Sequence, residues 1–124
     1  MSLAGARLQA KSAEYQKLQG DLATLVDKRT RLDAQLSENE MVKKEFANLT
    51  PNNTIYKLVG PVLVPQDQGD VKNNVETRLE FIRGEMKRVD GQIKETERNS
   101  EKKKLELVEI QTELQQTRSG APSS

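Results

Sequence analysis

The sequence predicts a mainly α protein in which two long helices form an antiparallel coiled coil and a small β-hairpin connects them. Two long proline-free segments repeat apolar residues at spacings of three and four, as paired helices require. A short β-branched segment containing Gly and Pro separates these two segments. Of the 124 residues, 34% are hydrophobic and 31% are charged, which suits a thin helical protein better than a thick core. We expect a single domain.

The first predicted helix covers residues 7–49. Its heptad repeat is best populated between Tyr15 and Leu36, where Arg29 is the only polar residue of the seam. A single arginine there sets the register or extends its guanidinium to the edge of the seam. The apolar positions change register near Asn39, and the following prolines end the helix.

The connection is predicted to form a β-hairpin over residues 55–64. Apolar, largely β-branched residues lie on both sides of Gly60-Pro61. Glycine as the first central residue and proline as the second suit a type II′ turn. Because an isolated two-stranded hairpin is marginal in water, its apolar residues and open edges require partners. We therefore expect the hairpin to assemble with other copies or with homologous chains.

The second predicted helix covers residues 71–117, with Asp70 as its cap, or Asn73 together with Glu76. Two rows of residues at heptad spacing form its seam, and charged residues occupy most remaining positions. The connection is long enough to reverse the chain, so the helices should run antiparallel, with the hairpin at one end and both termini at the other. Residues 118–124 are expected to be a disordered tail. The seam rows are Leu79, Met86, Ile93, Ser100, Leu107 and Leu114, and Val75, Ile82, Val89, Thr96, Lys103, Ile110 and Thr117.

The residue types that are absent limit the function. The chain contains no His and no Cys, which removes an imidazole base, a thiolate nucleophile and a His or Cys metal cage. Isolated carboxylates on a heptad surface have no pocket around them, so we expect no enzyme, no metal and no cofactor. Positive and negative charges are interspersed, which argues against nucleic acid. No apolar run approaches the ~20 residues that span a bilayer, so we expect no membrane partner and a cytoplasmic location.

Apolar residues also gather near the free ends of the two predicted helices. Leu105 and Val108 fall outside the seam rows of the second helix, so apolar residues cover more than one face there. Two interpretations remain open, a broadened seam or an exposed apolar surface that binds other proteins.

Two long helices joined by the hairpin sequence of residues 55–64, Ile-Tyr-Lys-Leu-Val-Gly-Pro-Val-Leu-Val, resemble a β-class prefoldin subunit. The following Gln66-Asp67 and the downstream segment 79–82, Leu-Glu-Phe-Ile, continue the match. The resemblance covers about residues 10–117. Its specific part is the hairpin, because many unrelated proteins share heptad repeats.

The resemblance implies an ATP-independent chaperone without cofactors, a heterohexamer of α-class and β-class subunits. In this family the hairpins build a β-barrel platform, and the coiled-coil tips hold unfolded actin and tubulin for delivery to the cytosolic group II chaperonin. Carried onto this chain, the subunit-assembly residues are Ile55, Tyr56, Leu58, Val59, Gly60, Val62, Leu63 and Val64. The client-binding residues are Leu3, Leu8, Leu107, Ile110 and Leu114.

A structural coiled-coil scaffold or adaptor without client-holding activity is the alternative function. Such a protein would also have heptad repeats, but this function does not explain the central hairpin. Assembly through residues 55–64 distinguishes the two.

Overall fold

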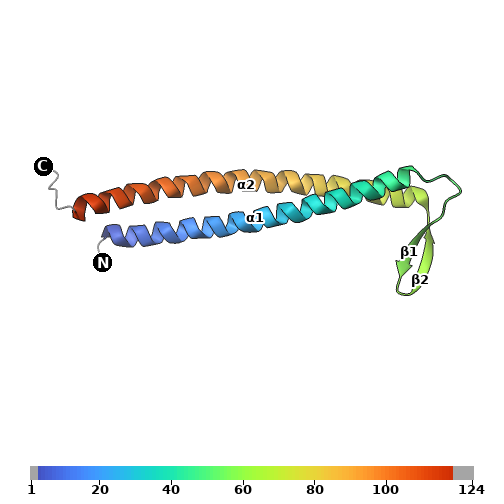
Figure 1. Cartoon of the computed structure of the whole chain (residues 1–124), viewed down its shortest axis with the longest axis horizontal. Coiled ribbons are helices and arrows are strands. Elements are labelled where there is room, and N and C mark those ends of the chain that lie inside the picture. The colour runs from blue at the N-terminus through green and yellow to red at the C-terminus, as the bar shows by residue number, and fades with distance from the viewer. Residues whose placement is uncertain (1–2, 119–124) are drawn as a thin grey trace. The chain divides into compact units, whose positions relative to one another are not determined.

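The computed structural model describes residues 3–118 (Figure 1). Helix α1 spans Leu3–Ala47 and helix α2 spans Gln68–Arg118. Strands β1, Ile55–Val59, and β2, Val62–Gln66, lie between them in the sequence and pair antiparallel. The predicted fold class of two long helices with an intervening β-hairpin is confirmed.

The observed helices are longer than the predicted ones at their starts. Helix α1 begins at Leu3 instead of residue 7, and helix α2 begins at Gln68 instead of residue 71. Helix α2 extends through Arg118, and the remainder of the expected disordered tail, residues 119–124, lies outside the described residues.

The chain divides into two compact units, and each contains a stretch of both helices. The terminal unit comprises residues 3–28 and 89–118 of the described chain, and the hairpin unit comprises residues 29–88. Inside each unit the helices run antiparallel, because the α2 partner comes earlier in the sequence as the α1 residue comes later: Glu113 and then Lys103 for Arg7 and Glu14, and Arg83 and then Glu76 for Glu40 and Lys43. In the terminal unit Arg7 pairs with Glu113, and in the hairpin unit Lys43 pairs with Glu76.

The buried residues of the described chain lie at predicted seam positions, whereas other seam residues such as Ile93 and Leu107 are half-buried and Thr117 is exposed. In the hairpin unit the core consists of Leu32, Val75, Leu79, Ile82 and Met86. In the terminal unit Val89, Ser100 and Ile110 are buried. Burying such apolar side chains stabilises the helix pairs by roughly 1.5–3 kcal/mol for each full side chain.

The register shift predicted near Asn39 is present in α1. Asn39 and Val42 are half-buried, whereas Lys43, the position an unbroken heptad would use, is exposed. From Asn39 the seam thus advances by three residues to Val42, and not by four to Lys43. Such a step is how a break in the heptad repeat changes which residues face the other helix. Arg29 is half-buried in the seam, and its Nη1 lies 3.8 Å from Asp33 Oδ1. The guanidinium therefore has an ion-pair partner on its own helix.

After α1 ends at Ala47, the connection forms a hydrogen-bonded turn that contains Pro51. The Asn53 amide donates to the Thr50 carbonyl at 3.0 Å, which places Pro51 at the second turn position, where its fixed φ is favourable. The Thr50 amide in turn donates to Asn53 Oδ1 at 2.7 Å. The Gln68 side-chain amide donates to the Thr50 and Asn53 carbonyls. The first turn of α2 is thereby tied to the connection.

The N-cap of α2 is Asp67, so the predicted caps Asp70 and Asn73 are wrong. Asp67 Oδ1 accepts a hydrogen bond from the Asp70 amide at 3.1 Å, the contact that an N-cap side chain makes with the third helical residue. The Asp67 carbonyl accepts the first helical bond from the Val71 amide at 3.1 Å. Because this cap lies three residues before Asp70, α2 begins three residues earlier than predicted.

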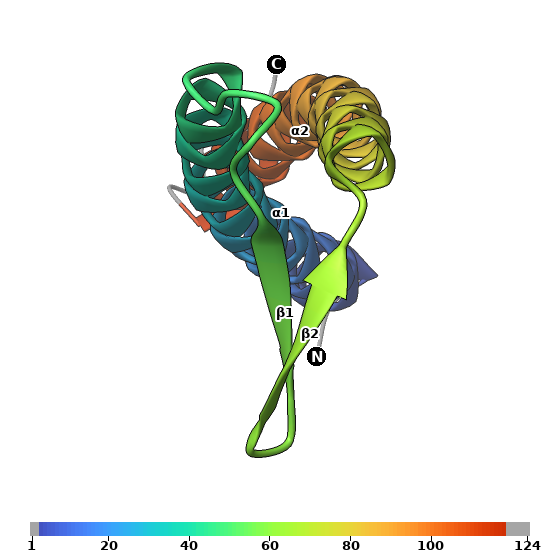
Figure 2. The same cartoon turned by 90° about the vertical axis from the view of Figure 1, so that its right-hand side faces the viewer.

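The hairpin closes through a two-residue turn at Gly60-Pro61. Val59 pairs with Val62, and Gly60 has φ of 58°. Positive φ at the first central residue with proline at the second defines a type II′ turn, because a type I′ turn needs positive φ at both. Figure 2 shows the two strands leaving the neighbouring helix ends as a separate ribbon.

Replacing Gly60 with Ala should loosen the hairpin, because a Cβ at positive φ is strained. We expect a loss of about 1–2 kcal/mol, seen as faster amide exchange of the hairpin ladder by roughly 5–30-fold. Gly84 is the matched control, because it lies inside α2 and an added Cβ there meets nothing within 4 Å. Gly84→Ala should instead raise the free energy of unfolding by roughly 0.5–1 kcal/mol. Equal effects of the two substitutions would contradict the turn assignment.

Candidate functional site

The hairpin residues predicted to mediate assembly are largely exposed within this chain. Their apolar side chains range from 38% exposure at Val64 to 68% at Leu58, and Ile55 alone is half-buried. Apolar residues at this density on a surface normally mark a contact with another molecule. The structure brings all eight together on one hairpin: Ile55, Tyr56, Leu58, Val59, Gly60, Val62, Leu63 and Val64.

The strand register sorts these side chains onto two faces. Tyr56 pairs with Pro65 and Leu58 with Leu63, so one face is entirely apolar. The other face carries the pairs Ile55–Gln66, Lys57–Val64 and Val59–Val62, which mix apolar and polar groups. A two-stranded sheet has no second layer to cover either face, so both are available for packing against other chains.

A hollow of about 420 Å³ lies between the hairpin and the two helices of the hairpin unit. Four of the five β1 residues, 55–58, line it on one side, whereas β2 contributes only Gln66. The helices contribute apolar side chains, among them Val42, Phe46 and Val75. Lys57, Asn74 and Arg78 also line it, so the hollow beside β1 has both apolar and polar walls.

A smaller groove of about 260 Å³ lies between the helices of the same unit. Phe46, Ala47 and Val75 give it an apolar lining, and the ion-paired Lys43 and Glu76 also line it. Apolar surface near the base of the hairpin thus extends from the strands onto both helices.

The predicted client-binding residues differ widely in exposure. Leu3 is 81% exposed, whereas Leu8, Leu107 and Leu114 are half-buried. Ile110 is only 2% exposed, so its placement on an open client surface needs correction. It lies in a seam row of α2, and seam residues face the other helix.

Two apolar residues of α2 that were not among the predicted client-binding set are open to solvent. Leu105 is 58% exposed and Val108 is 52% exposed. They are three positions apart and therefore share one side of the helix. The sequence already indicated that these two residues are exposed, because both fall outside the seam rows of the second helix.

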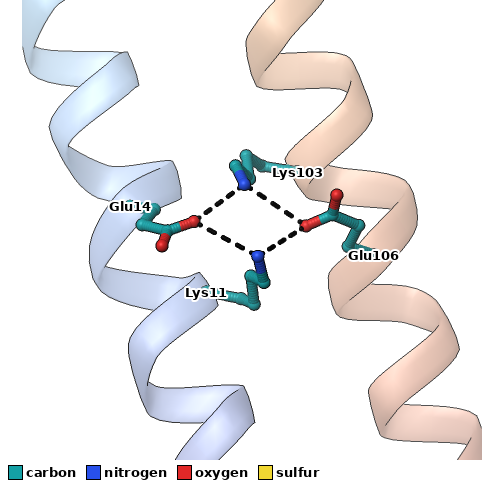
Figure 3. Close-up of polar contacts among 4 residues, drawn as sticks. All are labelled: Lys11, Glu14, Lys103 and Glu106. Carbon is teal, nitrogen blue, oxygen red and sulfur yellow. Dashed lines mark hydrogen bonds and ion pairs between the residues drawn. The ribbon is translucent and has the colours of Figure 1, made fainter.

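Four charged residues of the terminal unit form a closed ion-pair cluster between α1 and α2 (Figure 3). Lys103 Nζ lies 2.8 Å from Glu14 Oε2 and 3.4 Å from Glu106 Oε2. Lys11 Nζ lies 3.3 Å from Glu106 Oε2 and 3.6 Å from Glu14 Oε2. Each cation therefore contacts both anions, and the four formal charges cancel.

The cluster shifts the protonation equilibria of its members in opposite directions. The hydrogen bond from Lys103 lowers the pKa of the Glu14 carboxyl, and the hydrogen bond from Lys11 lowers the pKa of the Glu106 carboxyl. The same contact with Glu14 raises the pKa of the Lys103 ammonium. All three shifts favour the charged forms, so the cluster persists across neutral pH.

A second polar contact lies in the seam of the terminal unit. Ser100 is buried, and its Oγ accepts a hydrogen bond from the Gln19 side-chain amide. The polar seam residues Ser100 and Lys103 are therefore bonded across the helix pair. Such specific polar contacts favour one register over others, because a slipped pair would leave the groups unsatisfied.

Across residues 3–118, no group of three or more His, Cys, Asp or Glu side chains is arranged to hold a metal ion. No helix in this part of the chain is both long and apolar enough to cross a membrane.

The comparisons with known proteins identify the family. A family model described as "Prefoldin subunit" matches residues 9–118. The chain therefore belongs to the prefoldin subunit family and is a subunit of a prefoldin-type co-chaperone, which confirms the resemblance seen in the hairpin sequence. Family membership also supports assembly with other prefoldin subunits.

Several similar proteins carry the name prefoldin subunit 6. The human protein of that name is 41% identical over 119 residues, covering 94% of this chain and 92% of the human one. The Saccharomyces cerevisiae protein is 39% identical over 98 residues, covering 79% and 86% of the two chains. The crystal structure of the prefoldin beta subunit from Thermococcus strain KS-1 shares the fold, with a TM-score of 0.74 at 17% identity, over 82% of this chain and 89% of that one.

The ion-pair cluster predicts an acid-sensitive terminal unit. Because Glu14 and Glu106 have lowered pKa values in the folded chain, their stabilisation is present above the unfolded pKa and is lost as pH falls through the folded pKa. Melting followed by circular dichroism should show a smaller loss of Tm between about pH 5 and about pH 3 in a Glu14→Gln/Glu106→Gln variant than in the parent.

The matched control for this experiment is Glu101→Gln/Glu109→Gln, which removes the same charge from exposed positions of α2. The control should retain the parent's acid sensitivity. An unchanged loss of Tm in the Glu14→Gln/Glu106→Gln variant would show that the cluster does not set the acid limit.

Proposed function

We propose that this chain is a subunit of a heterohexameric prefoldin, which holds unfolded proteins and passes them on without using ATP. The observation that carries the proposal is the exposed apolar hairpin in a chain of the prefoldin subunit family. The other subunits would be α-class and β-class prefoldin chains. The hairpin would join theirs in a β-barrel platform.

The energetics of the hairpin support this assembly. Five residues per strand cannot bury either sheet face on their own, and two-stranded hairpins are marginal in water. Moving a half-exposed Val or Leu into an interface contributes on the order of 1 kcal/mol each. Several such residues on each of several subunits supply the driving force for a closed assembly.

The helix ends of the terminal unit support client binding. Leu3, Leu105 and Val108 expose apolar surface there. Each contact would be weak, but several copies or related subunits around one unfolded chain gain affinity through effective concentration. We propose unfolded actin and tubulin as clients, delivered to the cytosolic group II chaperonin, with a cytoplasmic location for the whole process.

The proposed activity needs no bond making, so it fits a chain without His or Cys. A structural scaffold or adaptor without client holding remains the competing function. Holding assays on the assembled complex separate the two, because a scaffold would assemble without protecting any client.

The first test concerns assembly. Val59→Asp should leave the isolated chain folded, since Val59 is 55% exposed, but should block incorporation into the complex by placing a charge in an apolar interface. Size-exclusion chromatography with light scattering, alone and with the other prefoldin subunits, measures this. Asn52→Asp is the matched control, because it adds the same charge in the connection before β1, and it should assemble normally. Normal assembly of the Val59→Asp variant would show that the hairpin does not form the interface.

The second test concerns client binding. Leu105→Ser/Val108→Ser should assemble normally but suppress aggregation of denatured actin less well, because only exposed apolar surface is lost. Glu109→Ser/Gln111→Ser changes exposed polar residues of the same helix and should hold actin like the parent. Equal protection by both variants would exclude Leu105 and Val108 from the client surface.

The buried Ile110 should behave differently from these exposed residues. Ile110→Ala should lower the free energy of unfolding by about 2–5 kcal/mol, because it opens a cavity in the seam. Chemical denaturation measures this loss. If the variant holds actin less well without a loss of stability, Ile110 belongs to the client surface after all.

A further inference from the structure

The hollow beside β1 contains two cations without a counter-charge. Lys57 of the hairpin and Arg78 of α2 both line it. Among the residues that the structure describes, no aspartate or glutamate contributes to its walls. Two like charges in one hollow repel each other, and covering them with an apolar surface would cost free energy. The hollow therefore favours a negatively charged group.

The strand geometry places the Lys57 side chain on the side of the hairpin that faces this hollow. Ile55 and Gln66 form the cross-strand pair at the base of the hairpin, and they are the only half-buried residues of the two strands. Alternate residues of a strand share a face, so Lys57 lies on the same face as Ile55. Within the described chain, the Lys57 ammonium forms no hydrogen bond and no ion pair.

Arg78 is held in place by a neutral group. Its Nη1 donates a hydrogen bond to Asn39 Oδ1 at 3.3 Å, and Asn39 Nδ2 in turn donates to the Gln35 carbonyl at 2.7 Å. These contacts orient the guanidinium but bring no negative charge. A guanidinium has five N–H donors in a planar fork that matches a carboxylate. Since Arg78 forms no ion pair with any described residue, most of its donors remain available to a carboxylate from another molecule.

A second copy of this hairpin cannot supply the missing anion. Residues 55–66 contain no Asp or Glu, and Lys57 is their only charged residue, so another copy would bring a third cation. Exposed apolar side chains lie nearby, with Leu58 exposed by 68% and Phe81, three positions after Arg78 on α2, by 67%. A partner that covers these side chains also removes water from the cations, which strengthens both attraction and repulsion.

We propose that the hollow binds an acidic side chain of a neighbouring prefoldin subunit whose sequence differs from this chain, and that Lys57 and Arg78 together select that neighbour. The inference rests on the proposed function, in which the hairpin is the assembly element, and it adds the residues that determine which chain is accepted. A carboxylate in the hollow would accept hydrogen bonds from both cations. A neighbour with a neutral or basic group there would leave two charges unpaired in the interface.

Removing both charges tests this selection. Lys57→Gln/Arg78→Gln should weaken incorporation into the complex with the other prefoldin subunits by about tenfold or more at low salt. Raising the salt concentration from about 0.05 M to about 0.5 M should weaken incorporation of the parent, because salt screens charges, and should affect the variant much less. Size-exclusion chromatography with light scattering measures both effects.

Lys44→Gln/Lys87→Gln is the matched control, because it removes two cations from exposed helix positions of the same unit. It should incorporate like the parent and keep the parent's salt dependence. Unchanged incorporation or an unchanged salt dependence of the Lys57→Gln/Arg78→Gln variant would overturn the proposal. If the parent chain itself fails to assemble, the proposed function fails, which is a different result.

Cross-linking of the assembled complex with a carbodiimide gives a second measurement, made on the unmodified chain. The reagent joins a lysine amine to a carboxylate in direct contact as an amide, so mass spectrometry identifies the residue that Lys57 meets. We expect Lys57 to be joined to an aspartate or glutamate of a different prefoldin subunit, and Lys44 to form no such link. The absence of a link from Lys57, or a link only to its own chain, a second copy or bound actin, would overturn the proposal.

Discussion

In each unit, α1 and α2 bury one narrow apolar stripe against each other, and the other features depend on this contact. A helix pair with a single shared seam leaves most of its surface in water, which is why charged residues make up 31% of the chain. In the hairpin unit the seam holds five buried apolar residues. The same unit carries the hairpin, whose side chains the seam does not cover. The fold thus stabilises the helices and leaves the apolar side chains of the strands exposed.

The seam of the terminal unit has a different composition. Ser100 is buried and bonded to Gln19, and the cluster formed by Lys11, Glu14, Lys103 and Glu106 takes positions that apolar side chains could occupy. Exposed ion pairs add little to stability, but their geometry disfavours a slipped register. The two helices of this unit are therefore aligned more specifically, but they bury less apolar surface. Leu105 and Val108 remain outside the seam, where they are accessible to other proteins.

The sequence predicted the helices, the hairpin and its turn because each follows from local rules. Heptad spacing determined which residues are buried, and Gly60-Pro61 determined the turn. The cap of α2 was assigned wrongly because Asp67 and Asp70 are both good caps, and the choice depends on the path of the chain before the helix. The burial of Ile110 follows from its place in a heptad row, so its assignment to the client surface disregarded information that the sequence contained. Ion pairs between the helices also depend on register, which the heptads restrict but do not fix.

Pro65 has a consequence for the size of the assembly. A strand with two competent edges can add a neighbour on each side, and such growth has no built-in end. A closed β-barrel ends such growth, because its last strand pairs with its first and no edge remains. Pro65, the partner of Tyr56 in the hairpin, removes one N–H donor from β2 and so disfavours open-ended strand addition at that edge while the subunit is free.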